Sequence, residues 1–323
     1  MKKRYLIILA SCVLSSCQGA PGTMSASSAP PASVVPHAAA QARPSVGRAS
    51  WMEPDAKKKE LMYVSDPINW DIAVYDYHSR TQVGMLSTGL DYPEGMCVDK
   101  NGNVWVANSG AYNMLEFPHG AKTAIATLDD NSYEPVSCSI NPKNGDLAVG
   151  NILYFREGLE GNVTIFKGAA GTGTAYGVAA MYSYYFVGYD GNGNLFFDGT
   201  NSQPGTNGQF EYAELPSGSS TPHSLTLAGG SVSFPGNVQW DGKEIAVGDQ
   251  SNAVIYQTSG SQIVGQTPLT GSSDVVGYFI KGKTVIGPDA GNDRVEFFHY
   301  PAGGKAYETI TRPAQPTAVV ISK

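Results

Sequence analysis

Charged residues are scarce in this 323-residue sequence, of which only 15% is Asp, Glu, Lys or Arg. Coiled coils and helical repeats are rich in Glu, Lys, Leu and Ala, so the composition excludes both. General disorder is also excluded, because a hydrophobic content of 41% is enough to fill a core. The chain is instead rich in turn formers and β formers, with 38 Gly, 20 Pro and 18 Tyr. This balance predicts an all-β protein with many turns.

The apolar run at the N-terminus is too short to span a bilayer. It covers residues 5–14 and follows three basic residues, an order typical of a signal peptide. It ends in Leu14-Ser15-Ser16-Cys17, which resembles the bacterial lipobox; the similar Leu9-Ala10-Ser11-Cys12 would leave too few apolar residues before the cut. The resemblance implies a signal peptide over residues 1–16 and lipidation of Cys17. An ordinary signal peptide that contains a Cys is the alternative.

Residues 17–58 are dominated by Ala, Ser and Pro and have no hydrophobic periodicity, which predicts a flexible tether. Two or more acyl chains on Cys17 would hold it stably at a membrane. Bacterial lipoproteins kept in the inner membrane carry Asp after the lipidated Cys. Gln18 in that place favours the outer membrane or the cell surface. We therefore expect a lipid-anchored protein of the cell envelope.

Six copies of one strand pattern follow one another from residue 60 onward. In the clearest copy an Asn-Gly turn at residues 101–102 joins a first strand to a second strand that ends at Asn108. The third strands each carry an aromatic residue, at Tyr75, Phe117, Phe166, Tyr212, Tyr256 and Phe297. The first and last of these are 222 residues apart, or about 44 residues per copy. A four-stranded propeller blade has about 40–50 residues.

The two ends of this array complement each other. Residues 60–65 have the pattern of a second strand, so the first copy lacks a first strand, and residues 316–322 have the missing first-strand pattern. The C-terminus would complete blade one and remove the open edge of the array. We predict a six-bladed β-propeller over residues 59–323.

Four cysteines are present, and two of them, Cys97 and Cys138, lie in the predicted propeller. An oxidising compartment permits a disulfide between them. They are 41 residues apart, close to one repeat, but the repeats align Cys97 with Ser139. This offset favours two buried thiols, with a disulfide as the alternative.

The second copy resembles a known repeat. Residues 93–99 and 101–108 resemble the NHL repeat and the related blades of SMP-30/gluconolactonase-like and virginiamycin B lyase-like proteins. The resemblance extends over all six copies and is sharpest in the second. It implies the propeller fold, whereas lactonases, lyases and interaction modules all occur on such propellers.

In such a ring, the starts of the first strands and the ends of the second strands meet on one face. The candidate ligand-binding residues at the mouth of the channel are Glu94, Asn108, Glu134, Asn151, Asn237, Asp249 and Asp274, and Asp66, Asp198 and Asp289 occupy further second-strand ends. Their oxygens suit Ca²⁺ or another divalent cation. Alternatively, Asp and Asn at strand ends form turns. The three acidic residues at first-strand starts, Glu94, Glu134 and Asp274, would bring like charges close together. A cation or water would reduce the repulsion between them.

The SMP-30 resemblance implies a divalent metal held by Glu94 and Asp274, and with it a lactonase. Asn237 departs from the family, because it stands one residue later than the metal-binding Asn and a one-residue shift turns a strand side chain to the other side. No substrate-binding Asn is found near residues 176–184. A virginiamycin-lyase-like mechanism needs a His at the channel mouth, and the repeats place none there.

The predicted propeller is acidic. From residue 59 onward it has 14 Lys or Arg and 26 Asp or Glu, a formal charge of −12, which excludes nucleic acid as a partner. We predict a ligand-binding or protein-interaction module rather than an enzyme, with a metal-dependent hydrolase as the alternative. The expected partners are the membrane, through the lipid anchor, and a protein, small-molecule or carbohydrate ligand. We expect a monomer.

Overall fold

The computed structural model describes residues 49–154, 159–311 and 314–323. The predicted signal peptide, the lipidation site Cys17 and most of the predicted tether lie outside the described residues. No helix in the described ranges is long and apolar enough to cross a membrane.

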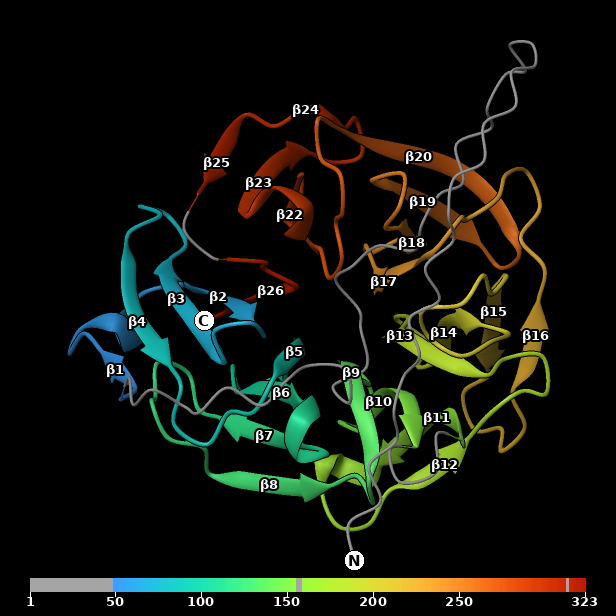
Figure 1. Cartoon of the computed structure of the whole chain (residues 1–323), viewed down its shortest axis with the longest axis horizontal. Coiled ribbons are helices and arrows are strands. Elements are labelled where there is room, and N and C mark those ends of the chain that lie inside the picture. Colours follow the sequence, from blue (N-terminus) through green and yellow to red (C-terminus); the bar gives the residue numbers. More distant parts are fainter. Residues whose placement is uncertain (1–48, 155–158, 312–313) are drawn as a thin grey trace, which may run out of the picture.

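Six sheets surround a common axis (Figure 1), and their strands pair antiparallel except for the parallel pairing of β20 with β24. From the axis outward, blade one contains β26 (Ala318–Ser322), β2 (Leu61–Asp66), β3 (Asp71–Asp76), β4 (Gln82–Leu86) and β1 (Trp51–Met52). Blade two contains β5 (Pro93–Val98), β6 (Val104–Asn108), β7 (Asn113–Phe117) and β8 (Ala126–Asp129). Blade three contains β9 (Tyr133–Ile140), β10 (Leu147–Tyr154), β11 (Leu159–Phe166) and β12 (Thr174–Tyr176).

The other three blades repeat this order. Blade four contains β13 (Ser183–Tyr189), β14 (Leu195–Thr200), β15 (Phe210–Leu215) and β16 (His223–Leu225). Blade five contains β17 (Pro235–Trp240), β18 (Ile245–Asp249), β19 (Val254–Ser259), β20 (Gln262–Thr270) and, at its outer edge, β24 (Gly304–Lys305). Blade six contains β21 (Phe279–Lys281), β22 (Thr284–Asp289), β23 (Arg294–His299) and β25 (Glu308–Ile310). Short 3-10 turns are η2 (Ala56–Lys58), η3 (Ser109–Ala111), η4 (Lys167–Ala169) and η5 (Ala290–Asn292).

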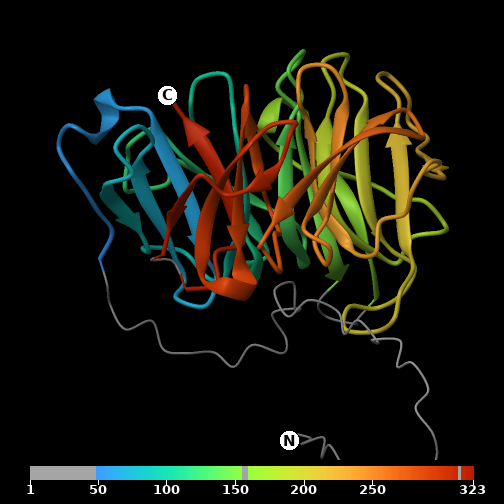
Figure 2. The same ribbon diagram turned by 90° about the horizontal axis from the view of Figure 1, so that it is seen from above.

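The C-terminal strand closes the ring, as predicted. β26 pairs antiparallel with β2 over its whole length, from Ala318 opposite Ser65 to Ser322 opposite Leu61. The Ser65 hydroxyl accepts a hydrogen bond from the Ala318 amide at 3.0 Å. The C-terminus lies at one face of the ring (Figure 2). The prediction of an all-β, six-bladed propeller is confirmed.

The core lies between neighbouring blades, because successive residues of each strand face opposite neighbours. Met96 packs in a cluster with residues of blade one, whereas the next residue, Cys97, packs in a cluster with blade three. Trp105 and Phe166 belong to this second cluster, and both are almost completely buried. Burial of such large apolar side chains stabilises a fold by about 1.5–3 kcal/mol each. Blade-to-blade packing therefore holds the ring together.

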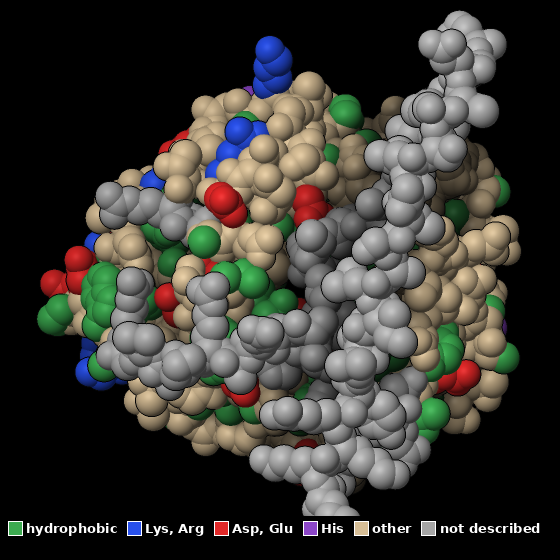
Figure 3. Space-filling model, in the orientation of Figure 1, with side chains coloured by type: hydrophobic (Ala, Val, Ile, Leu, Met, Phe, Trp, Pro, Cys, Tyr) green, Lys and Arg blue, Asp and Glu red, His purple; other side chains and the backbone are tan. Residues whose placement is uncertain are grey.

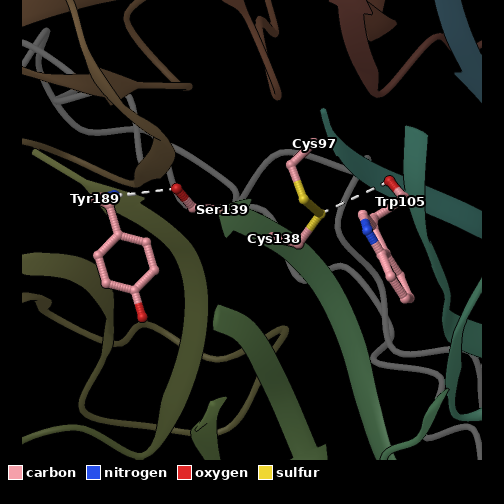
Figure 4. The surroundings of a disulfide bond; sticks show 5 residues. All are labelled: Cys97, Trp105, Cys138, Ser139 and Tyr189. Atoms are coloured by element: carbon pink, nitrogen blue, oxygen red, sulfur yellow. Dashed lines mark hydrogen bonds between the residues drawn. A yellow bond between two sulfur atoms is a disulfide. The ribbon is translucent and has the colours of Figure 1, made fainter. Parts of the chain in front are cut away.

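Cys97 and Cys138 form a disulfide between blades two and three (Figure 4), so the expectation of two buried thiols was wrong. The structure agrees with the alignment of Cys97 with Ser139. Both Pro93 and Pro135 pair with the end of a second strand. Cys97 and Ser139 each lie four residues after one of these prolines. Equivalent positions in two blades face the same way around the ring. A disulfide between neighbouring blades therefore needs two cysteines whose side chains point in opposite directions around the ring. The one-residue offset between Cys97 and Cys138 provides this, because successive side chains of a strand point to opposite faces.

Ordered chain begins before residue 59, the predicted start of the propeller. β1 pairs with the outer strand of blade one, Trp51 opposite Met85 and Met52 opposite Gly84. Ala56 is fully buried in the same blade. The last residues of the segment predicted as a tether are thus part of blade one.

Candidate functional site

One face of the ring, called here the entry face, carries the start of every innermost strand beside the end of the second strand. The pairs of opposed residues that define it are Ser65 with Ala318, Asn108 with Pro93, Asn151 with Pro135, Thr200 with Ser183, Asp249 with Pro235 and Asp289 with Val275. All the candidate residues named from the sequence lie at these positions or within two residues of them.

Asp249 at the end of β18 holds its own loop. Its Oδ2 accepts hydrogen bonds from the Ser233 amide and from Asn252 Nδ2, both at 2.8 Å. Asn252 also donates to Ser233 Oγ at 2.8 Å. The same arrangement recurs in blade six around Asp289, with Ser273 and Asn292. These carboxylates fix the loops of the entry face, as Asp and Asn do in turns.

Two of the three candidate asparagines, Asn108 and Asn151, also serve the local structure. Asn108 Oδ1 accepts from the Asp91 amide at 2.6 Å, and its Nδ2 donates to Asn113 at 3.1 Å. Asn151, which is fully buried, donates to Asn162 and Thr164, both at 2.9 Å. Each amide ties a second strand to its neighbouring segments.

Asn237 and Asp274 both connect neighbouring segments around blades five and six. Asn237 Nδ2 donates to the Tyr278 carbonyl at 2.6 Å. Asp274 accepts from Gln250 Nε2 at 2.7 Å, and its amide donates to Asp289 Oδ1 at 3.3 Å.

Glu94 and Glu134, called here the carboxyl pair, are brought close together by a tight approach of β5 and β9. A Cβ on Gly95 would lie 2.4 Å from the Val136 carbonyl oxygen, so only glycine allows the two strands to come this near. The pairing of β5 with β6 shifts register between Pro93 and Met96, and the resulting bulge contains Glu94. Bulges of this kind re-aim a side chain.

The carboxyl pair is buried, with exposed fractions of 4% for Glu94 and 1% for Glu134. Burial, and secondly the charge of Glu134, raises the pKa of Glu94 well above its usual value. Glu94 Oε1 is buried without a hydrogen-bond partner. Such an atom has lost its water and gained nothing in return, which costs about 1–3 kcal/mol or more for a charged group.

Three tyrosines from different segments, called here the tyrosine shell, lie near enough for a charge on Glu94 or Glu134 to raise their pKa. Tyr92 precedes β5, Tyr112 follows η3, and Tyr185 belongs to β13 of blade four. Burial raises the pKa of Tyr112 to about 12, with a smaller effect of Glu134. Burial and the charge of Glu94 likewise raise the pKa of Tyr92 and of Tyr185. Sequence reasoning missed this tyrosine shell, although Tyr92 stands directly before the Pro93-Glu94-Gly95 motif.

Asp130 lies next to this group, in the loop from blade two to blade three. Its amide donates to the Tyr112 carbonyl at 3.1 Å. The side chain is 2% exposed and its Oδ2 has no partner. Burial raises its pKa from 3.8 to about 7, against smaller opposing hydrogen bonds from Thr164 and Asn151.

Glu94 and Asp274, the predicted metal ligands, have different neighbours: Glu94 is coupled to Glu134, and Asp274 is bonded to Gln250. Within the described ranges, no three Asp, Glu, His or Cys side chains converge as a metal site would require. The carboxyl pair and its tyrosines can accept hydrogen bonds and attract positive charge.

The histidines that the structure describes lie near the ends of third strands or on outer strands. His119 Nδ1 is 2.7 Å from Ser322 Oγ and its Nε2 is 3.0 Å from the Lys59 carbonyl, so this ring connects the C-terminal strand to the chain before β2. On the face shown in Figure 3, a few small, separate patches of acidic side chains lie on a surface that is mostly uncharged.

Comparison with known proteins agrees with this architecture. The family model of the NHL repeat matches residues 90–117, which contain the first three strands of blade two. No curated protein matches the chain in sequence. The chain is therefore a six-bladed β-propeller with a match to the NHL repeat in its second blade.

Solved propellers are similar in structure. A chain from the nidogen/laminin complex superposes with a TM-score of 0.65 at 12% identity, covering 82% of this chain and 98% of that one. Streptogramin B lyase gives 0.54 at 15% identity, covering 80% and 76%. A protein of unknown function from Bacteroides caccae gives 0.61 at 12% identity, covering 82% and 99%. At these identities the likeness concerns the fold alone.

Proposed function

We propose that this propeller is a binding module of the cell envelope, tethered through Cys17, that takes a protein partner at its entry face. The proposal rests on the contacts that fix the loops and blades of this face in place. The loops after β18 and β22 are fixed by the same Asp, Asn and Ser contacts, and the disulfide joins the two blades that carry the carboxyl pair. A surface that is ordered before binding loses little entropy when a partner docks.

The relatives give this proposal a precedent. One similar structure comes from a complex of two proteins, nidogen and laminin. Propellers present the loops of one face around a closed ring, and functional residues are often carried by loops on a rigid scaffold. The Asp and Asn residues of the entry face fit this role, because most of them hold loops in place.

The test uses a photo-crosslinking amino acid in the full-length protein, in cells that produce it. Benzoylphenylalanine replaces Ile68, which is 40% exposed after β2 on the entry face, or Lys143 in the exposed β9–β10 turn on the opposite face as the matched control. A binding module predicts a discrete adduct from position 68 and none from 143. Absence of any adduct at 68, or equal adducts at both positions, would refute it.

A further inference from the structure

Glu94 has an unsatisfied acceptor in a place where positive charge is favoured. Its carboxyl is 96% buried, given an exposed fraction of 4%, and Oε1 has no hydrogen-bond partner. Glu134 lies close enough to oppose its ionisation. Burial and the neighbouring carboxyl group disfavour the ionised form of Glu94, and a cation placed beside it would favour that form.

The tyrosine shell suits an organic cation. Tyr92 and Tyr112 belong to blade two and Tyr185 to blade four, and the charge of Glu94 or Glu134 raises the pKa of each. A tyrosine hydroxyl can accept a hydrogen bond from an ammonium or guanidinium group, as a carboxylate can. Tyr112 is only partly buried.

We propose that the carboxyl pair receives the charged end of an Arg or Lys side chain from the partner protein. This inference rests on the proposed binding function and specifies the chemistry of the partner. A guanidinium offers five donors in a plane and can satisfy Glu94 Oε1 while it neutralises both carboxylates. The long alkyl stem allows a charged group to reach a buried acceptor from the surface.

Charge complementarity favours this occupant over a neutral or anionic one. The propeller has a formal charge of −12 from residue 59 onward. An anionic group would be repelled by a charged Glu134, and a neutral group would leave an ionised Glu94 without a counter-ion. A basic side chain removes both problems.

The first experiment titrates the full-length protein with N-acetyl-arginine amide and, as an isosteric neutral control, N-acetyl-citrulline amide, by isothermal calorimetry. We expect the arginine compound to bind at least about tenfold more tightly than citrulline, as a desolvated charge pair requires. Glu94→Gln removes the charge but keeps the shape, and should abolish this difference. Glu53→Gln, an exposed acid at the rim of blade one, should change the affinity by less than about twofold.

Equal binding of the two compounds by the wild-type protein would overturn the inference without any variant. An arginine preference that survives Glu94→Gln would also overturn it. The crosslinking experiment separates this failure from that of the proposed function. An adduct at position 68 that Glu94→Gln leaves unchanged would keep the binding module and reject the basic side chain, whereas absence of the adduct would reject the module itself.

Discussion

Asp130 should make the stability of the propeller fall as pH rises. Its pKa in the folded protein is about 7, against 3.8 for the free side chain, because burial disfavours the charged form. Between these two values the folded protein holds a proton that the unfolded chain has released, so the proton stabilises the fold at low pH and the stabilisation is lost as pH rises through 7. Each pKa unit corresponds to 1.36 kcal/mol, so the whole effect is about 4 kcal/mol.

The variant Asp130→Asn isolates this contribution, since Asn keeps the shape and does not titrate. From pH 5 to pH 8 the Asp130 proton accounts for a loss of about 2.5 kcal/mol of unfolding free energy. Urea denaturation at pH 5 and pH 8 measures the unfolding free energy of both proteins. Between these pH values the wild type should lose about 2.5 kcal/mol more unfolding free energy than Asp130→Asn. Other buried acids, such as Glu94 and Asp198, contribute equally to both proteins.

The control is Asp55→Asn, because Asp55 is exposed and forms an ion pair with Lys58 at the surface. It should leave the pH dependence of the wild type unchanged. If wild type and Asp130→Asn lose the same stability between pH 5 and pH 8, or if the wild type gains stability, then burial does not control this carboxyl and the reasoning fails.

Three further predictions concern the disulfide, the ring closure and the anchor. Replacing both Cys97 and Cys138 with Ala should lower the unfolding free energy in urea by roughly 4 kcal/mol, because the bridge closes a loop of 41 residues; a loss under about 1 kcal/mol would contradict a structural bridge. Truncation after residue 315 removes β26 and exposes β2, so cooperative unfolding in circular dichroism should disappear, whereas removal of Lys323 alone should preserve it; a cooperative truncated ring would contradict closure by β26. Cys17→Ser should move the protein from the detergent phase to the aqueous phase in Triton X-114 partitioning, while Cys12→Ser should not; the opposite pattern would assign the anchor to Cys12.

The fold could be predicted from the sequence because each blade repeats the same local pattern. Aromatic third strands, Asn-Gly turns and the first-strand pattern at residues 316–322 are all local signals, and ring closure follows from counting strands. The disulfide could not be predicted in this way. It depends on the direction in which the side chains of Cys97 and Cys138 point around the ring. The alignment of repeats matches positions along the chain and does not give that direction.

The candidate site was predictable only in part. Positions such as Glu94, Glu134 and Asp249 were found from strand starts and ends, but their roles depend on partners that local patterns do not give. Asp249 is held by Asn252 and Ser233, whereas Glu94 meets Glu134 from another blade. Tyr185 joins them from a third blade, and no spacing in the sequence indicates that contact.

The central claim is that the entry face binds a protein partner, and the pattern of photo-crosslinks over both faces tests it most directly. Benzoylphenylalanine at Ile68, which is 40% exposed after β2, and at Tyr112 probes the entry face. The same group at Lys100 and Lys143, in exposed turns between first and second strands, probes the opposite face. We predict one adduct of the same mass from positions 68 and 112 and none from 100 and 143. Adducts confined to positions 100 and 143, or none at any position, would contradict it.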